Sequence, residues 1–443
     1  MSGPIRLPPR LRHVAPLLSR RLWTARAITW GGAIAVSLTA LAFARAADAA
    51  QGVLLWLLHG RPWAALLLAP AGLALSVWMT RRFFPGAQGS GIPQTIAALH
   101  LSDARAIDAV LSVRVGIGKV LLTLLGLACG ASIGREGPTV QVGAAVMHGL
   151  GRAFGLARHD LRRGVVLAGG AAGIAAAFNT PLAGIVFTIE ELSHSFETRT
   201  SGTVLTAVIL AGITTLALAG DYSYFGTTAA ELDVGAGWAA VALCALVGGL
   251  LGGLFSTMLL FASRGLPGRA GQLLIRHPVS FAALCGLALA GIGLLSGGTT
   301  YGTGYAQARH VIEGTATLPL LYAPLKLLAT VVSYLSGIPG GIFAPSLSVG
   351  AGLGEWLAPL VPRAPESAVV LLGMVAYFSG VVQAPITATV IVMEMTDNQH
   401  MTIPLLATAM LAFGASRLVC PHALYGALAR QFQAAVERRK TTG

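Results

Sequence analysis

Three glycine-rich segments of this 443-residue chain have the residue types expected of a site for a small anion. They are residues 89–93 (Gly-Ser-Gly-Ile-Pro), 134–138 (Gly-Arg-Glu-Gly-Pro) and 340–345 (Gly-Gly-Ile-Phe-Ala-Pro). Each ends in proline and runs into an apolar stretch, and proline is favoured in the first turn of a helix because its missing N–H costs nothing there. Each segment therefore predicts a helix start. The unpaired N–H groups of a helix start carry about half a positive charge, so converging starts bind an anion without a fixed cation.

Glu136 is the carboxylate within these segments, beside Gly137 and the basic Arg135. At a helix start its side chain can fold back into the position meant for the anion. Desolvation and a neighbouring anion both favour its neutral form, and a protonated Glu136 would leave that position and admit the anion. The side chain would then be both gate and proton acceptor. The alternative is a plain carboxylate that stabilises the helix start.

Other polar side chains fit the same hypothesis. Ser90 and Tyr425 would add hydroxyl donors, and Glu190 and Glu191 end the apolar stretch that begins near Pro181. Carboxylates in or near a membrane are functional hypotheses by default, and one of this pair would receive protons from the cytoplasm. The residues alone do not separate this interpretation from an interfacial pair with both side chains in water.

Each of two basic residues has two possible roles. Arg135 and Lys119 add positive field near the anion pathway, or they pair with carboxylates or lipid headgroups, and for Lys119 the pairing is the preferred interpretation.

The composition requires a membrane around these helices. The chain is 55% hydrophobic and only 11% charged, with a mean hydropathy of +0.73, whereas a soluble domain has about a quarter of its residues charged. Apolar runs near the length that spans a bilayer, about 17–25 residues, occur at 27–43, 62–79, 238–261, 281–295, 369–393 and, shorter, 403–413. We therefore predict an all-α polytopic membrane protein.

The net charge of +13 does not indicate nucleic-acid binding, because the basic residues flank membrane segments and no aromatic–basic platform appears. Basic flanks mark the cytoplasmic side, so both termini are predicted to be cytoplasmic. No metal-ligand spacing is present, and no cofactor is expected. The basic residues near the ends are Arg6, Arg10, Arg12, Arg20, Arg21 and Arg26, then Arg430, Arg438, Arg439 and Lys440.

An internal repeat divides the chain. Four positions recur at a nearly constant offset of 204 or 207 residues: Pro138 and Pro345, Gly169 and Gly373, Pro181 and Pro385, Glu190 and Glu394. We predict a basic cytoplasmic segment (1–26), a first membrane repeat (27–220), a polar loop (221–235), a second membrane repeat (236–418), and a last helix with Tyr425 and a basic tail (419–443). Repeats of this length place the substrate site between two pseudo-symmetric bundles.

With these motifs the chain resembles the CLC family of chloride channels and proton-coupled chloride transporters. The resemblance covers about residues 27–430 and includes the three glycine-rich motifs, residues 176–184 (Ala-Ala-Phe-Asn-Thr-Pro-Leu-Ala-Gly), 394–396 (Glu-Met-Thr) and Tyr425. It implies an inverted-repeat fold of about eighteen helices, many of them re-entrant or tilted. It also implies a homodimer in the cell membrane, the inner membrane of a bacterium, with one pathway per subunit.

The resemblance also implies roles for single residues. Ser90 and Tyr425 would supply hydroxyls to a central chloride, joined by the backbone N–H groups of Ile342 and Phe343, with Gly91, Gly137 and Arg135 in the same motifs. Glu136 matches the gating glutamate. Glu191 matches the internal proton-transfer glutamate of the exchangers, and this favours it over Glu190.

Two departures from the family pattern stand out. Gln94 stands where the first motif usually continues with glutamate, which puts local packing or pairing in doubt. The chain stops soon after Tyr425, so the paired cytoplasmic domains of many relatives are not expected. Ser90, rather than proline, favours chloride over nitrate by similarity.

The predicted function is voltage-sensitive chloride transport, as a chloride/proton antiporter in which the anion site is gated by a carboxylate. The main alternative is a passive chloride channel on the same fold, and an acid at Glu191 favours the exchanger. A remote alternative is an intramembrane hydrolase with Ser90 as nucleophile, but that chemistry needs a positioned base. No histidine lies in a comparable motif, so the chain is not expected to be an enzyme.

Overall fold

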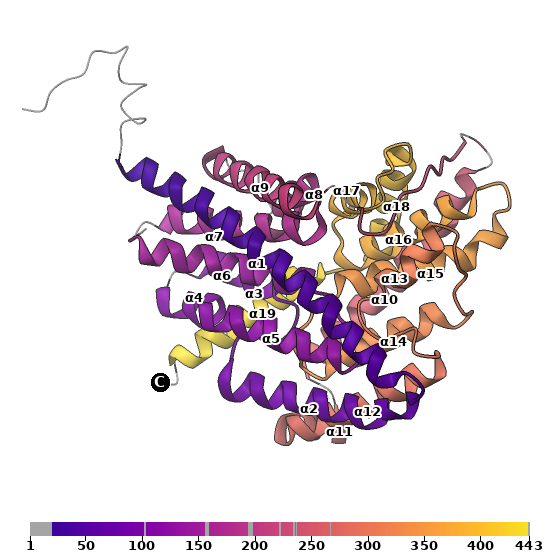
Figure 1. Cartoon of the computed structure of the whole chain (residues 1–443), viewed down its shortest axis with the longest axis horizontal. Helices are drawn as coiled ribbons and strands as arrows, with labels where there is room; N and C mark the ends of the chain where they lie inside the picture. The colour runs from indigo at the N-terminus through magenta and orange to yellow at the C-terminus, as the bar shows by residue number, and fades with distance from the viewer. Residues whose placement is uncertain are drawn as a thin grey trace, which may run out of the picture.

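The computed structural model describes residues 20–101, 103–155, 159–193, 198–220, 223–233, 235, 237–265 and 267–441, and these are mostly helical (Figure 1). Arg6, Arg10 and Arg12 lie outside them. Between the helices of the described residues, two isolated β-bridges occur and no strand.

In chain order the α-helices are α1 (Arg20–Leu58), α2 (Ala65–Phe83), α3 (Ile92–His100), α4 (Ala104–Leu111), α5 (Val113–Ala128), α6 (Glu136–Ala153), α7 (His159–Phe178), α8 (Pro181–Phe187), α9 (Thr198–Ala219), α10 (Trp238–Ser263), α11 (Gly268–Arg276), α12 (Pro278–Leu295), α13 (Tyr305–Ile312), α14 (Tyr322–Leu335), α15 (Phe343–Leu357), α16 (Glu366–Val382), α17 (Pro385–Met395), α18 (Thr402–Val419) and α19 (Leu424–Thr441). Short turns η3 (Pro62–Ala64), η4 (Thr188–Ser193, π-helical) and η5 (Ala358–Leu360) join some of them.

Seven helical segments of the described chain are long and apolar enough to cross a membrane. The predicted span 369–393 is not among them, and this prediction is wrong. The run is divided because Gln383 adopts a left-handed conformation with φ 58° and Pro385 then starts α17. Proline restricts the residue before it and lacks the N–H that a continuing helix needs. Apolar composition alone did not show this break.

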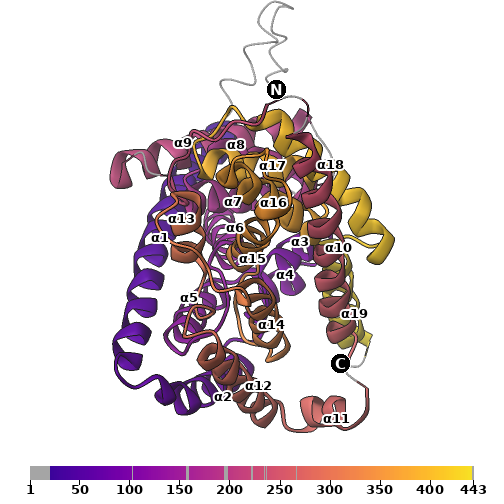
Figure 2. The ribbon, with the colours of Figure 1, turned by 90° about the vertical axis from the view of Figure 1, so that its right-hand side faces the viewer.

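The two halves of the chain repeat one packing pattern. In the first half, α6 packs on α7, and α1 packs on both α7 and α9. In the second half, α15 packs on α16, and α10 packs on both α16 and α18 in the same way. Two further pairs join the halves, α2 with α12 and α8 with α17, and both pairs lie side by side in the two views (Figures 1 and 2). The predicted duplication is therefore visible in the helix contacts.

The α8–α17 pair shows how the halves are related. The Glu190 carboxylate accepts hydrogen bonds from the N–H groups of Ile386 (3.2 Å) and Thr387 (2.7 Å) at the start of α17. The equivalent Glu394 accepts from Leu182 (3.1 Å) and Ala183 (2.7 Å) at the start of α8. Each helix end thus caps the other helix's start, which requires the two helices to run antiparallel. This reciprocity is what an inverted repeat with a two-fold axis between α8 and α17 produces, as the family resemblance implied.

Small residues bring the helices of the second half into backbone contact. A Cβ atom at Gly252 on α10 would lie 2.6 Å from the Tyr377 carbonyl oxygen on α16, and one at Gly249 would lie 2.5 Å from the Ala412 carbonyl oxygen on α18. Close packing of this kind is the main attraction between helices in lipid, where the hydrophobic effect between them is absent. It holds α16 and α18 in place around the helices that carry the site.

Candidate functional site

The three glycine-rich segments meet at one place, as predicted. Gly134 and Gly341 exchange two backbone hydrogen bonds, with N–H to carbonyl distances of 2.7 and 2.8 Å. The Gly340 N–H donates to the Gly89 carbonyl at 3.0 Å, and the Gly89 N–H donates to the Ile338 carbonyl at 3.3 Å. The starts of α3, α6 and α15 follow these residues directly. Gly134 and Gly341 are 207 residues apart, the repeat offset, so equivalent residues pair with each other at the repeat interface.

Two glycines allow α3 and α6 to start against each other. A Cβ atom at Gly137 would lie 2.5 Å from Ser90 Oγ and 2.9 Å from the Ser90 carbonyl oxygen. Gly91 has a φ of 106°, and a Cβ atom there would lie 2.6 Å from the Gly137 carbonyl oxygen. Only glycine combines that conformation with so close an approach. The two motif glycines therefore bring Ser90 to the start of α6.

Gln94 and Lys119 hold the first of these segments in shape. Gln94 Oε1 accepts from the Gly91 N–H at 3.0 Å, and its Nε2 donates to the Gln88 carbonyl. The Lys119 ammonium, fully buried, donates to the Ala87 and Gly89 carbonyls at 2.7 Å each. The amide at position 94 thus uses both its oxygen and its nitrogen in hydrogen bonds without carrying a charge. Lys119 pairs with backbone carbonyls rather than with carboxylates or headgroups.

The starts of α6 and α15 lack side-chain caps. The residues before them, Arg135 and Ile342, make no capping hydrogen bond to the first turn. Ile342 and Phe343 are 2% and 1% exposed, so water has little access to their N–H groups. Buried helix starts without partners attract a negative group, because their dipoles and unpaired N–H groups point the same way.

Two buried hydroxyls are also without a partner. Ser90 and Tyr425 are 2% and 0% exposed, and neither oxygen has a hydrogen-bond partner within 3.5 Å in the described part of the chain. The two hydroxyls lie near each other, and Glu191 and Glu136 are close enough to act on Tyr425 electrostatically. The Tyr425 ring packs 5.8 Å from the Phe343 ring between centroids. Buried polar groups are nearly always hydrogen-bonded, so this pair indicates a place for a bound ligand.

A substitution at Tyr425 tests that ligand. Tyr425→Phe removes the hydroxyl and keeps the ring packing, so we expect the Kd for chloride to rise about three- to tenfold, the effect of losing one hydrogen bond of about 1 kcal/mol. Tyr425→Ala also removes the packing on Phe343 and should weaken binding further. Calorimetry on purified protein measures both, and an unchanged Kd in Tyr425→Phe would contradict a hydroxyl contact.

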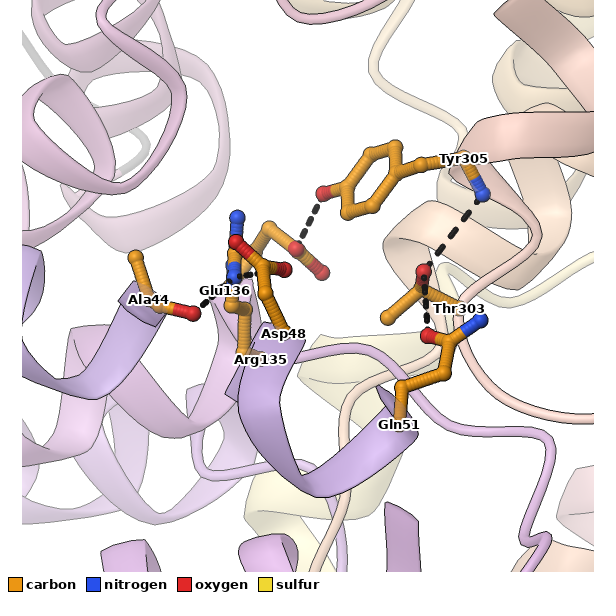
Figure 3. Close-up of polar contacts among 7 residues, drawn as sticks. All are labelled: Ala44, Asp48, Gln51, Arg135, Glu136, Thr303 and Tyr305. Carbon is orange, nitrogen blue, oxygen red and sulfur yellow. Dashed lines mark hydrogen bonds and ion pairs between the residues drawn. The ribbon is translucent and has the colours of Figure 1, made fainter. Parts of the chain in front are cut away.

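Glu136 is fully buried at the start of α6 and faces Tyr305 of α13 (Figure 3). Its Oε1 accepts a hydrogen bond from the Tyr305 hydroxyl. Its Oε2 has no partner among the described residues and lies against Gly134, where a Cβ atom would collide with it and would lie 3.3 Å from the Ala344 nitrogen. Within the described chain, no N–H group of α6 is found donating a hydrogen bond to this carboxylate. Its position between two helix starts does not fit a plain helix cap.

Arg135 is paired with α1. Its Nη1 donates to the Ala44 carbonyl at 2.5 Å and to Asp48 Oδ1 at 2.8 Å (Figure 3). The guanidinium also lies over two aromatic rings, 5.0 Å from the centroid of Tyr224 and 5.7 Å from that of Tyr305. Arg135 thus has the carboxylate partner that one reading required, while it stays next to Glu136 in the chain.

Glu190 and Glu191 have different surroundings. Glu190 caps α17 with both carboxylate oxygens, so its role in the repeat is structural. Glu191 is 2% exposed, and its Oε1 has no partner among the described residues. The interpretation that both side chains lie in water is therefore wrong for Glu191. Both acids lie on η4, a π-helical turn, and such turns are frequent at functional sites.

Three residues near the site were not identified from the sequence. Tyr305 follows a Gly-Thr-Gly turn that resembles the other motifs only weakly, and nothing in its spacing pointed to Glu136. Asp48 lies in the middle of α1, far from any motif. Lys326 had a usable signal, since it stands 207 residues after Lys119. Like Lys119, it is fully buried and donates to backbone carbonyls, those of Thr300 (3.0 Å) and Gly302 (2.7 Å).

Comparison with known proteins agrees with this architecture. The family model described as "Voltage gated chloride channel" matches residues 72–417. The H(+)/Cl(-) exchange transporter ClcA of Yersinia pseudotuberculosis serotype IB (strain PB1/+) is 31% identical over 432 residues, which cover 92% of this chain and 88% of the relative. The protein of the same name from Vibrio vulnificus (strain YJ016) is 32% identical over 361 residues, or 79% and 75% of the two chains.

Solved structures show the same fold. The crystal structure of a slow cyanobacterial Cl-/H+ antiporter matches with a TM-score of 0.79 and 25% sequence identity, covering 93% of this chain and 98% of the other. A CLC-type fluoride/proton antiporter matches with a TM-score of 0.77 at 21% identity, covering 93% and 99%. The helix starts that meet at Gly134 and Gly341, the family match and these relatives together show that the chain belongs to the voltage gated chloride channel family, the CLC family.

Proposed function

We propose that this protein exchanges chloride for protons across the membrane, with Glu136 as the gate and outer proton acceptor and Glu191 as the inner proton-transfer residue. One observation carries the proposal. The buried Ser90 and Tyr425 hydroxyls have no hydrogen-bond partner among the described residues, and two buried acids, Glu136 and Glu191, lie within electrostatic reach of Tyr425. The names of the relatives, chloride/proton exchangers, support the same substrates.

The anion site would work through dipoles. Chloride would sit between the Ser90 and Tyr425 hydroxyls and the N–H groups of Ile342 and Phe343, with the backbone of Gly91 and Gly137 fixing the approach and Arg135 adding positive field. A fixed ammonium at this position would bind the ion more strongly in low dielectric than transport allows. Lys119 of α5, the buried ammonium that binds the Gly89 carbonyl of the first segment, is occupied by carbonyl oxygens. The ion is therefore held by groups of partial charge and can leave.

The proton would move by competition for one position. Ionised Glu136 and chloride cannot both occupy the space at the starts of α6 and α15, because like charges repel strongly at short range in low dielectric. Protonation removes that repulsion and releases the side chain, so chloride entry follows proton uptake. Glu191 would pass the proton to or from the cytoplasmic side.

Such an exchange is sensitive to voltage for a simple reason. Chloride moving one way and a proton moving the other way carry charge in the same electrical direction. Each elementary charge that crosses is worth about 2.3 kcal/mol per 100 mV. The membrane potential therefore acts on every cycle without a separate voltage sensor.

A reconstituted flux assay tests the proposal. A chloride gradient across proteoliposomes should drive protons uphill, with both ions monitored and the membrane potential clamped by valinomycin and potassium. Chloride conductance without proton movement would instead establish the passive channel. Replacing chloride by nitrate in the same assay tests the selectivity attributed to Ser90, and we expect slower flux with nitrate.

A hydrolase is not supported. The Ser90 hydroxyl has no hydrogen-bonded base among the described residues, and catalysis by a serine needs one. As a member of the CLC family the chain is a transporter, not an enzyme.

The family and the charge distribution support a proposal for the oligomeric state, the membrane and the orientation of the termini. We propose a homodimer in the cell membrane, the inner membrane of a bacterium, with both termini cytoplasmic. Cross-linking of the reconstituted protein at low density would show the dimer, and a monomer there would contradict it. Reporter fusions at Arg430 test the orientation, since a periplasmic C-terminus would overturn it.

A further inference from the structure

We propose that Tyr305 is a positioning residue for the gate. Its hydroxyl holds ionised Glu136 in the anion position at the starts of α6 and α15 and so sets how much chloride is needed to displace the side chain. This inference rests on the proposed function, because it deepens the role given to Glu136.

The contact itself is specific. Tyr305 donates its hydroxyl hydrogen to Glu136 Oε1, and the other oxygen, Oε2, is left at the starts of α6 and α15 without a partner. A hydrogen bond to an ionised carboxylate is about twice as strong as one between neutral groups. Tyr305 therefore favours the ionised, seated side chain over the protonated one that leaves.

The tyrosine ring is fixed before it meets the carboxylate. It packs against the rings of Tyr224 and Phe225, with centroid distances of 4.6 and 5.2 Å. The Arg135 guanidinium lies 5.7 Å from the ring centroid. Because these contacts restrict the ring, little conformational entropy is lost when the hydroxyl binds Glu136.

The turn that precedes Tyr305 is fixed as well. Gly304 has a φ of 84°, and a Cβ atom there would collide with Ser348. The Tyr305 N–H donates to Thr303 Oγ1 at 3.4 Å, and Thr303 Oγ1 donates to Gln51 of α1 at 3.5 Å (Figure 3). Lys326 binds the Gly302 carbonyl at 2.7 Å. The buried lysine of the second repeat thus anchors the turn that places the hydroxyl.

A basic hollow lies beside Arg135, the residue before Glu136. A cavity of about 600 Å³ is lined by Arg45, Arg135 and Arg309, with Asp48 as the acid among its lining residues. The hollow reaches Arg135, the residue before Glu136, and Tyr224, which packs on Tyr305. Such a hollow concentrates anions there. Chloride would therefore compete with the carboxylate from this side, and the Tyr305 hydrogen bond opposes that competition.

The variant Tyr305→Phe tests the inference, because it removes the hydroxyl and keeps the ring packing. We expect the chloride concentration for half-maximal flux in proteoliposomes to fall about tenfold, the size expected for a hydrogen bond to a charged group. The maximal turnover should change less than about twofold. Tyr301→Phe is the matched control, since the Tyr301 hydroxyl also donates to one buried acceptor, the Ala290 carbonyl at 3.3 Å.

A second background shows whether the effect passes through the gate. In Glu136→Ala there is no carboxylate to hold, so adding Tyr305→Phe should leave the half-maximal chloride concentration unchanged. A fall that persists in this background, or a Tyr305→Phe protein that behaves like Tyr301→Phe, would overturn the inference. If Glu136→Ala kept full proton coupling, Glu136 would not be the gate and the proposed function would fail. If Glu136→Ala lost coupling but Tyr305→Phe had no effect on the half-maximal chloride concentration, only the role of Tyr305 would be contradicted.

Discussion

Glu136→Ala is expected to abolish proton transport while chloride continues to cross. The substitution removes the carboxylate that is buried between the starts of α6 and α15, and alanine neither competes with chloride nor accepts a proton. We expect uphill proton movement driven by chloride to fall at least about 100-fold, since general proton transfer by a positioned side chain is worth 10² to 10⁴ in rate. Chloride flux should stay within about tenfold of the wild type.

The measurement is the reconstituted flux assay with a pH electrode and a chloride electrode in one chamber. Glu313→Gln is a suitable control, because Glu313 follows α13 and pairs with Arg309 at 2.8 Å, away from Ser90, Tyr425 and the starts of α6 and α15. This variant should keep its coupling. Proton antiport that survives in Glu136→Ala would exclude the carboxylate as gate.

The meeting of the helix starts was predictable from the sequence, because glycine and proline determine it locally. Proline in the first turn starts α3, α6 and α15, and Gly91 and Gly137 allow the close approach at the interface. The repeat offset then indicated that segments 134–138 and 340–345 are equivalent. Equivalent segments in a two-fold arrangement can meet at the axis, and Gly134 and Gly341 do so.

The gate's partner was not predictable in the same way. Tyr305 reaches Glu136 from a loop after α12 that two contacts fix: Lys326 binds Gly302, 24 residues away in the chain, and Gln51 binds Thr303, 252 residues away. No local propensity records such a contact. The wrong span at 369–393 has a related cause, since hydropathy counts apolar residues and ignores the left-handed Gln383 that divides the run.

The two neighbouring acids show a different limit. The residues alone could not separate Glu190 from Glu191, because both lie at the end of one apolar run; the family resemblance favoured Glu191. The structure separates them: both lie on the π-helical turn η4, but Glu190 caps the start of α17 while Glu191 stays buried. Such turns are rare and have no strong sequence signal. Because two adjacent acids have such different surroundings, substitutions at each can be compared directly.

Glu191→Gln should stop proton movement while chloride still passes. Glutamine keeps the size and polarity of the buried side chain but cannot carry a proton at physiological pH, so we expect proton flux to fall at least about 100-fold and chloride flux to remain within about tenfold.

Glu190→Gln is the matched control on the adjacent residue. It should keep proton coupling, but it weakens two charge-assisted hydrogen bonds to the Ile386 and Thr387 N–H groups and should cost about 1 kcal/mol of stability, visible as a lower melting temperature of the purified protein. If proton transport instead followed Glu190 and survived at Glu191→Gln, the inner proton route would run along the face of α17, and the buried acid would have only a structural role.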